Sequence, residues 1–232
     1  MKRHSHAWFV ALLALACAPT VSAATSSFDE ARSKTVELKN QDHVLFFGDS
    51  LTYQAQGATG YVTLVRAELA RRHPNFSLKV SAIATNGHTV RHLLSRLDGD
   101  VISSKPTLVV IQIGCNDARR ISPVAFKAGL EEIVERLQKA KIQVVLSTLT
   151  SVGEKYDGTN EWDPELELFA EIARQIAISK EVPLNDLRKA FVEYWKKNNP
   201  KNLDEGLLTH DGNHFNEQGN RFVAEQMLLK FK

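Results

Sequence analysis

The sequence has little cysteine, little net charge and no long hydrophobic run, and each shortage excludes a class of protein. Among 232 residues there are two cysteines, Cys17 and Cys115, too few for a disulfide framework or a cysteine-rich metal site. The formal net charge is only +2, so the chain lacks the basic footprint of a nucleic-acid-binding protein. A composition that is 43% hydrophobic and 24% charged excludes a collagen-like, disordered or multi-spanning membrane protein.

Several catalytic and cofactor-binding motifs are also missing. There is no Gly-x-Ser-x-Gly, which excludes the nucleophile elbow of the α/β-hydrolase fold. Also missing are Gly-x-Gly-x-x-Gly, Gly-x-x-x-x-Gly-Lys and His-Glu-x-x-His, the signatures of dinucleotide, phosphate and zinc sites. We therefore predict an activity that uses no nucleotide, metal or other cofactor and needs only water as its second substrate.

The first 23 residues have the pattern of a secretory signal peptide. Lys2 and Arg3 give a basic start, residues 7–17 form an apolar run, and Val21-Ser22-Ala23 is a small-residue cleavage site. The run is shorter than the about 20 residues that span a bilayer, so we expect no stable membrane span in the mature chain. A short membrane anchor and lipidation of Cys17 are the alternatives. The pattern predicts export to the periplasm or the extracellular medium.

Beyond the signal peptide, the polar composition of residues 24–40 predicts a lead-in segment without regular structure before the folded domain. Residues 41–232 carry the patterns of that single domain. Short apolar runs predict strands at 43–47, 78–83, 107–113, 142–147 and 182–184. Apolar residues at helical spacing predict helices at 60–72, 90–97, 123–140, 164–179, 186–197 and 216–231, and 150–163 is a polar loop. This alternation favours a doubly wound parallel sheet with helices on both faces.

In such a sheet the chemistry lies beyond the carboxyl ends of the strands. Polar clusters stand at those places in the sequence. Gly48-Asp49-Ser50, Asn86-Gly87-His88 and Gly114-Cys115-Asn116-Asp117 follow the first three predicted strands, and Asp211-Gly212-Asn213-His214 precedes the last helix. We therefore expect the four clusters to meet at one edge of the sheet.

These clusters contain the parts of a serine esterase. Ser50 is the candidate nucleophile and His214 the base that would take its proton, while Asp211, three residues earlier, would fix the imidazole tautomer. The Ser50 amide, the Gly87 amide and the Asn116 side chain are candidate oxyanion donors. Taken singly, each of these residues is more often found as part of a turn, a helix cap or a surface loop than in a catalytic role.

In combination, the motifs resemble the SGNH, or GDSL, hydrolases. The resemblance rests on Gly48-Asp49-Ser50-Leu51, Gly87, Gly114-x-Asn116-Asp117 and Asp211-x-x-His214 in that order, and it extends over about residues 43–230. It implies a three-layer α/β/α, flavodoxin-like fold and an SGNH-type hydrolase domain over 41–232. It also implies Ser50, Asp211 and His214 as the catalytic residues, with Ser50, Gly87 and Asn116 forming the oxyanion hole.

Other residues near the motifs are candidates for binding substrate. His88 and Arg91 follow Gly87 and would line the pocket or simply begin a solvated helix. Trp162, in the polar loop, would form a platform for a sugar or acyl chain or cover the core. Arg119 and Arg120 would attract an acidic substrate or form a solvated pair.

The sequence thus predicts an exported serine esterase that acts through an acyl-enzyme, with short-chain O-acetyl groups on carbohydrate as the first choice of substrate. A lipase, lysophospholipase or thioesterase acting on longer chains is the alternative. A catalytically silent carbohydrate-binding protein is the alternative of another class, and an acyltransferase would use the same residues. The expected partners are a small-molecule or glycan ester and water, with no nucleic acid; the oligomeric state stays open.

Overall fold

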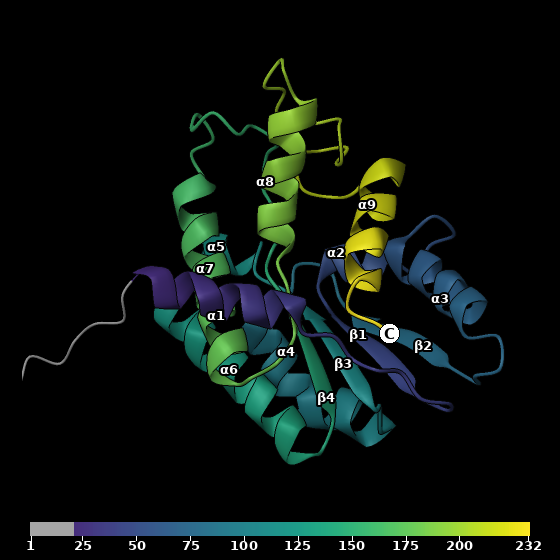
Figure 1. The fold of residues 1–232 in the computed structure, drawn as a ribbon. Coiled ribbons are helices and arrows are strands. Elements are labelled where there is room, and N and C mark those ends of the chain that lie inside the picture. Colours follow the sequence, from purple (N-terminus) through teal and green to yellow (C-terminus); the bar gives the residue numbers. More distant parts are fainter. Residues whose placement is uncertain (1–20) are drawn as a thin grey trace, which may run out of the picture.

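Five parallel strands form the centre of the structure, a computed structural model that describes residues 21–232 (Figure 1). They are β1 His43–Gly48, β2 Lys79–Ala84, β3 Leu108–Gln112, β4 Gln143–Ser147 and β5 Leu184–Asn185. Their order in the sheet is β2-β1-β3-β4-β5, and each neighbouring pair is parallel. This confirms the predicted parallel α/β fold, with a strand at each of the five predicted places.

Burial explains why the central strands lack the alternation of polar and apolar residues that marks a half-exposed strand. All residues of β1 and β3 are buried, since helices cover both faces of the sheet. The edge strand β2 is less buried. β5 is limited to two residues and follows Pro183, which has no N–H to donate.

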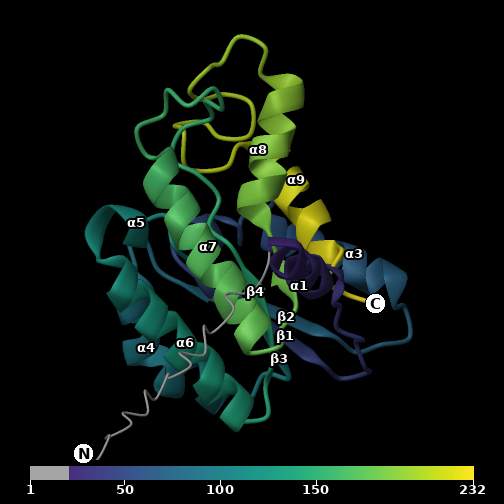
Figure 2. The same ribbon diagram turned by 60° about the vertical axis from the view of Figure 1, so that its left-hand side comes forward.

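Helices cover both faces of the sheet (Figure 2). α4 Val90–Arg96, α6 Pro123–Lys139 and α7 Asp163–Ser179 pack side by side on one face, and α3 Tyr61–Arg72 packs with α9 Glu217–Leu228 on the other. α8 Leu187–Asn198 contacts α9. These layers confirm the predicted three-layer α/β/α arrangement. Shorter turns of helix were not predicted: α2 Ser50–Gln54, α5 Asp117–Arg120, and the turns at Leu97–Val101 and Ile102–Ser104.

Helix α6 illustrates how local sequence determines an element. The Ser122 hydroxyl accepts a hydrogen bond from the Ala125 N–H at 3.3 Å, and Pro123 begins the helix, where its missing N–H costs nothing. The buried residues Phe126, Leu130 and Ile133 recur at helical spacing. Such a helix can be predicted from sequence because cap, proline and apolar face all agree.

The predicted lead-in over 24–40 differs from the structure. Helix α1 spans Val21–Ser33 and packs against α7 and β5, so the segment is not without regular structure. Ala31 is buried, and after the helix Val36 forms a parallel bridge with Phe231 near the C-terminus. These contacts are long-range, and a polar segment read locally does not reveal them. The predicted signal peptide, 1–23, lies almost wholly outside the described residues.

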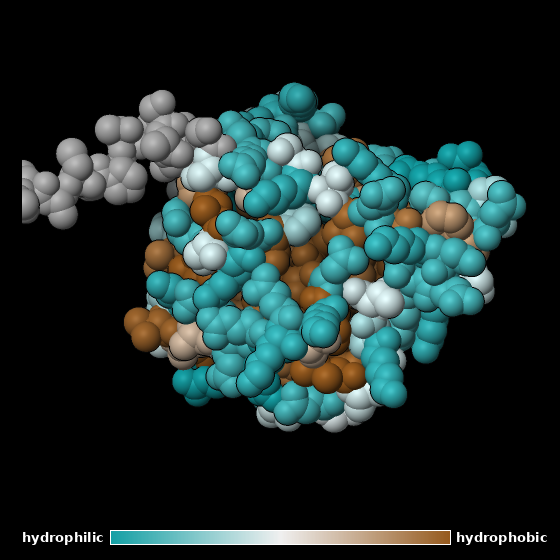
Figure 3. All heavy atoms as spheres, turned by 60° about the horizontal axis from the view of Figure 1, so that its bottom comes forward, coloured by the Kyte–Doolittle hydropathy of each residue, from teal (hydrophilic) through white to brown (hydrophobic). Residues whose placement is uncertain are grey.

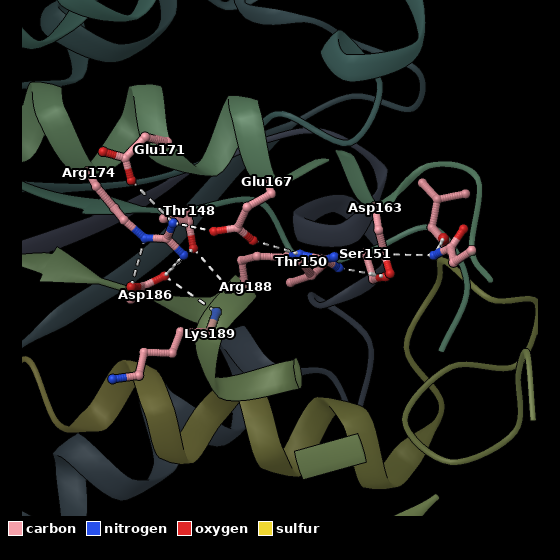
Figure 4. A network of polar contacts seen from close by, with 12 residues as sticks. Thr148, Thr150, Ser151, Asp163, Glu167, Glu171, Arg174, Asp186, Arg188 and Lys189 are labelled. Carbon is pink, nitrogen blue, oxygen red and sulfur yellow. Dashed lines mark hydrogen bonds and ion pairs between the residues drawn. The ribbon is translucent and has the colours of Figure 1, made fainter. Parts of the chain in front are cut away.

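A buried arginine anchors the long loop between β4 and α7 (Figure 4). From α8, Arg188 donates to the Asp163 carboxylate at 2.6 Å, to the Thr150 carbonyl at 3.4 Å and to the Ser151 hydroxyl at 3.3 Å. Nearby, Arg174 donates to the Asp186 carboxylate at 2.9 Å. The network fixes both ends of the loop, which contributes residues around the candidate site.

On the face shown in Figure 3, hydrophilic side chains cover most of the area and hydrophobic ones show between them. Within residues 21–232, no helix has the length and apolar character needed to cross a bilayer.

Candidate active site

Ser50 lies where β1 ends and α2 begins. Gly48, at the end of β1, has no room for a side chain, because a Cβ there would lie 2.3 Å from the Thr52 hydroxyl and 2.5 Å from the Gln112 carbonyl. Asp49 is the N-cap of α2, and its carboxylate accepts from the Leu51 N–H at 3.0 Å. This tight turn places Ser50 in the lining of a cavity, and 7% of the Ser50 surface is exposed to solvent.

His214 joins Ser50 to Asp211. Its Nε2 lies 3.0 Å from the Ser50 Oγ, and its Nδ1 lies 2.7 Å from Oδ2 of Asp211. The other carboxylate oxygen of Asp211 accepts from the His214 N–H at 2.7 Å and from the Asn213 N–H at 3.0 Å. The structure therefore brings together three residues that the sequence separates by up to 164 positions.

Hydrogen bonds to His214 and Asn213 also set the ionisation of Asp211. Partial burial acts to raise its pKa, but the bonds from the His214 ring and from the two backbone N–H groups outweigh it and lower the pKa to about 2. Asp211 is therefore an anion throughout the neutral range, as the partner of an imidazolium must be.

The loop that carries Asp211 and His214 is held by Glu154, a residue that the sequence analysis missed. Glu154 is fully buried, and its carboxylate accepts from the N–H groups of Leu207, Leu208 and Thr209 and from the Thr209 hydroxyl, at 2.7–2.8 Å. Further along, the His210 N–H donates to the His214 carbonyl at 2.9 Å. No local pattern marks Glu154, since it lies in a polar loop more than fifty residues before its partners.

Gly87 and Asn116 lie on the same cavity as Ser50. Gly87 has a φ of +73°, which favours glycine, and its carbonyl accepts from Arg120 at 2.9 Å. The Asn116 amide donates to the Asp49 carboxylate at 3.2 Å and to the His88 carbonyl at 3.1 Å. Both hydrogens of this amide are thus already donated, so donation to a substrate oxyanion requires one of them to change partner.

The cavity has a volume of about 310 Å³, and apart from Gly87 every residue that lines it has a polar or charged side chain. Beside the residues already described, it is lined by Gln54, Asn86, Arg119, Arg120 and Asn213. Gln54 was not singled out from the sequence, and Asn213 was named there only as part of the cluster that contains Asp211 and His214, with no role of its own.

The three predicted substrate-lining residues lie elsewhere. His88 stacks on His92 with ring centroids 4.7 Å apart, and Arg91 is exposed on α4; neither belongs to the lining of the Ser50 cavity. Trp162 lines a neighbouring hollow of about 310 Å³, whose lining also includes Asp211 and Gly212. Of the three, Trp162 therefore remains next to the site.

Two buried carboxyl groups lie beneath the site. Burial, only partly offset by the bond from the Leu51 N–H, raises the pKa of Asp49 to about 6. Burial also raises the pKa of Asp117 to about 7, although the Val90 N–H donates to its carboxylate at 2.7 Å. By contrast with Asp211, these carboxyl groups brace loops and are not exposed to a substrate.

One group of side chains in the described part of the chain could hold a metal ion. The ligand atoms of His210, Asp211 and His214 lie within 4.8 Å of one another. Asp211 and His214 already bind each other at 2.7 Å, so a metal would compete with the contact that joins them to Ser50.

Comparison with known sequences gives a family match and two curated relatives. The sequence profile of the GDSL-like lipase/acylhydrolase family matches residues 46–222. The chain is 27% identical over 213 residues to the acetylxylan esterase of Geobacillus stearothermophilus, covering 83% of this chain and 95% of that enzyme. It is 25% identical over 177 residues to an uncharacterized lipoprotein of Bacillus subtilis, covering 64% of this chain and 72% of the lipoprotein.

Solved structures agree with the sequence comparison. The crystal structure of an acetyl xylan esterase superposes with a TM-score of 0.77 at 35% identity, covering 80% of this chain and 97% of that one. The acetylxylan esterase of Geobacillus stearothermophilus superposes with a TM-score of 0.75 at 24% identity, covering 85% and 98%, and shares the fold. Catalytic variants of that enzyme, with a serine, a histidine or an aspartate replaced by alanine, are among the similar structures.

Proposed function

Since the chain belongs to the GDSL-like lipase/acylhydrolase family and is a carboxylic ester hydrolase with a Ser-His-Asp triad, we propose that Ser50, His214 and Asp211 form that triad. The family and the enzyme class predicted from the sequence are confirmed, and the alternative of a catalytically silent binding protein is set aside. The observation that carries the residue assignment is the continuous pair of contacts, 3.0 Å and 2.7 Å long, through the His214 ring.

The proposed reaction has two steps. The Ser50 oxygen attacks the ester carbonyl as His214 Nε2 takes its proton, and the collapsing tetrahedral intermediate expels the alcohol, which receives that proton. Water then attacks the acyl-enzyme, gives its proton to His214, and the released Ser50 oxygen takes the proton back as the carboxylic acid leaves. Asp211 holds the imidazole in one tautomer and stabilises its cation in both steps.

The oxyanion would be held by backbone donors first. The N–H groups of Ser50 and Gly87 have no hydrogen-bond acceptor within the described residues, so both are free to donate to a substrate oxygen. The Asn116 amide would join them by releasing the His88 carbonyl as the negative charge develops. One such donor contributes about 2.7–4 kcal/mol to transition-state stabilisation.

For the substrate, we propose short-chain O-acetyl esters on carbohydrate. The family relatives at 27% and 35% identity are acetylxylan esterases, which supports this choice. The cavity is also small, about 310 Å³, and no Leu, Ile, Val, Phe, Tyr or Trp lines it. Longer acyl chains would need a wide apolar patch, whereas the exposed large hydrophobic residues among those described belong to different helices and loops, and none of them lines the cavity: Tyr53, Val124, Leu168, Leu203 and Leu229.

We also propose that the protein is exported. The signal-peptide pattern of residues 1–23 supports export, as does the similarity to a lipoprotein. Cell fractionation of the full chain, with mass spectrometry of the mature N-terminus, tests this. A new N-terminus at Ala24 is the expected result, lipidation of Cys17 would favour a membrane anchor, and an uncleaved chain in the cytoplasm would contradict export.

The triad assignment is tested with Ser50→Ala. We expect kcat for nitrophenyl acetate to fall by at least about 10⁴ while the urea midpoint stays close to that of the wild type. Ser95→Ala, at an exposed serine of α4, is the matched control and should keep full activity. Full activity of Ser50→Ala would disprove the assignment.

Two further measurements test the substrate proposal. A series of nitrophenyl esters should give its highest kcat/KM at acetate, and a maximum at eight carbons or more would favour the lipase or thioesterase alternative. Added alcohol acceptors separate hydrolysis from acyl transfer, since a transferase would give a new ester in place of acetic acid.

A further inference from the structure

The cavity at Ser50 carries two cationic side chains and no acidic one. Its lining consists of Ser50, Gln54, Asn86, Gly87, Asn116, Arg119, Arg120, Asn213 and His214. Asp211 lies behind His214 and is bound to it, so its charge is directed at the imidazole. The electrostatic character of the space that receives the substrate is therefore set by Arg119 and Arg120.

Neither guanidinium has a carboxylate partner. Arg119 donates to the Cys115 carbonyl at 3.3 Å and to the Asn116 side-chain oxygen at 3.4 Å, and Arg120 donates to the Gly87 carbonyl at 2.9 Å. No carboxylate of the described chain lies within 4.0 Å of either, whereas Arg96, Arg136 and Arg174 each pair with an aspartate or a glutamate. Both arginines are exposed, and each guanidinium has five N–H donors, so several remain for a ligand.

The carboxyl groups beneath the cavity do not pair with either arginine. Asp49 and Asp117 are buried, and they accept hydrogen bonds from the Leu51 N–H, the Asn116 amide and the Val90 N–H instead. The two backbone carbonyls and one amide oxygen that hold the arginines carry no net charge. Two positive charges therefore face the bound substrate beside the reacting serine.

A guanidinium is well suited to one kind of ligand group. Its planar fork of N–H donors matches the two oxygens of a carboxylate and binds them in parallel, with charge-assisted hydrogen bonds. We infer that Arg119 and Arg120 bind a carboxylate of the substrate, so that the preferred ester is an O-acetyl group on an acidic glycan that bears a uronate on the acetylated sugar or on its neighbour. This inference rests on the proposed carbohydrate-esterase function and narrows its substrate class.

A purely structural role is the alternative for the same two residues. Arg119 and Arg120 hold Asn116 and Gly87, the proposed oxyanion donors, so their removal would slow the reaction with any ester. Such an effect is common to charged and neutral substrates. A ratio of kcat/KM values between two substrates that differ only in charge cancels it and leaves the contribution of the carboxylate.

The experiment compares acetylated trigalacturonide with the same acetylated trimer whose carboxylates have been converted to amides, with acetate release as the readout. We expect wild-type kcat/KM to favour the acidic trimer by about tenfold at low salt, because an arginine–carboxylate contact next to a reacting ester is only partly screened by water. At 1 M salt, where the Debye length is about 3 Å, the preference should shrink toward unity.

Variants assign the preference to the two arginines. The double variant Arg119→Gln/Arg120→Gln should lower the ratio to about 1, and Arg119→Lys/Arg120→Lys should retain part of it, since charge persists without the fork. Arg66→Gln is the matched control, because Arg66 is exposed, donates to a backbone carbonyl and lies outside the cavity. The control should keep the wild-type ratio.

The outcomes separate this inference from the proposed function. A wild-type ratio near 1, or a ratio that the double glutamine variant leaves unchanged, overturns the role of the arginines while acetate release still supports the esterase. An equal loss on both trimers assigns Arg119 and Arg120 to a structural role only and also overturns it. If neither trimer releases acetate while nitrophenyl acetate is cleaved, the result contradicts the proposed carbohydrate substrate and leaves the esterase activity supported.

Discussion

Glu154 offers a test of how the loop that carries the proposed catalytic residues Asp211 and His214 is positioned. Its carboxylate accepts hydrogen bonds from Leu207, Leu208 and Thr209, just before the segment that carries Asp211 and His214. Glu154 itself is fully buried and donates its own N–H to the Asp204 carbonyl at 2.8 Å. Replacing it therefore removes support from the loop without touching any residue that contacts the substrate.

The size of the effect follows from the bonds that are lost. Glu154→Ala leaves three backbone N–H groups and one hydroxyl without an acceptor, most of them buried. Hydrogen bonds to a charged group contribute about 1.5–3 kcal/mol each, but they are not additive, and removing one partner of a buried charged network costs about 3–5 kcal/mol. We expect a loss of that order in the free energy of unfolding for Glu154→Ala, and about 1–3 kcal/mol for Glu154→Gln, which keeps the volume and one acceptor oxygen.

Activity should fall along with stability, and for a separate reason. A loosened loop lets His214 drift from the Ser50 hydroxyl, and a displacement of about 1 Å at a catalytic group costs about 10² in rate. Urea denaturation gives the stability change, and kcat for nitrophenyl acetate, measured where each variant is fully folded, gives the rate change. Glu154→Gln should recover part of both losses relative to Glu154→Ala.

Glu161→Gln is the control, since Glu161 lies on the same loop, is exposed and forms no hydrogen bond or ion pair within the described residues. It should unfold at the wild-type urea concentration and keep the wild-type kcat. If Glu154→Ala behaved like Glu161→Gln in both measurements, the loop would not depend on the buried carboxylate and the reasoning would be refuted.

Two further predictions concern buried groups whose pKa is raised. Asp117 holds its proton to about pH 7 when folded and to about pH 4 when unfolded, so the free energy of unfolding should fall as the pH rises between these values, by on the order of 3 kcal/mol. Asp117→Asn should remove this contribution in urea titrations from pH 4.5 to 8, while the contribution of Asp49, whose pKa is raised to about 6, remains; an unchanged slope would contradict the assignment. The second prediction concerns Cys115, a buried thiol whose pKa is raised to about 11 by burial. In a Cys17→Ser variant, which leaves Cys115 as the single thiol, iodoacetamide should label the protein only after unfolding, because the thiolate is the reactive form. Rapid labelling of the native protein would contradict this prediction, since it would show that the thiol is accessible.

The strands and the larger helices were predictable because their signals are local. The run at 43–47 is nearly all apolar and the run at 107–113 is rich in β-branched residues, and the structure places β1 and β3 there, in the interior of the sheet. Their boundaries shift by one or two residues, as at Gly48, which extends β1 into the turn before Ser50. A buried parallel sheet imposes such runs on the sequence, so the fold can be read from them.

The meeting of Ser50, Asp211 and His214 was predicted by a weaker argument. The sequence places each cluster after an expected strand or before the last helix, and the rule that chemistry lies beyond the carboxyl ends of the strands brings them to one edge. The 3.0 Å contact between His214 Nε2 and Ser50 Oγ also requires a particular conformation of the loop that carries His214, and this rule does not predict that conformation. That conformation depends on Glu154, whose partners lie 53–55 residues away, a separation that no periodicity or spacing encodes.

The same reasoning explains why the sequence could not decide which of His88, Arg91, Arg119 and Arg120 meet the substrate. All four follow a candidate oxyanion donor in the sequence, and order along the chain cannot tell them apart. In the structure His88 stacks on His92 and does not line the cavity, whereas α5 is a single short turn that places Arg119 and Arg120 in the cavity lining with Asn116. The direction of the chain after each oxyanion donor decides which charged side chains the substrate meets, and tertiary packing sets that direction. One such packing contact is made by the Asp117 carboxylate, which is buried beneath the site and accepts a hydrogen bond from the Val90 N–H at 2.7 Å. This bond holds the starts of α4 and α5 together.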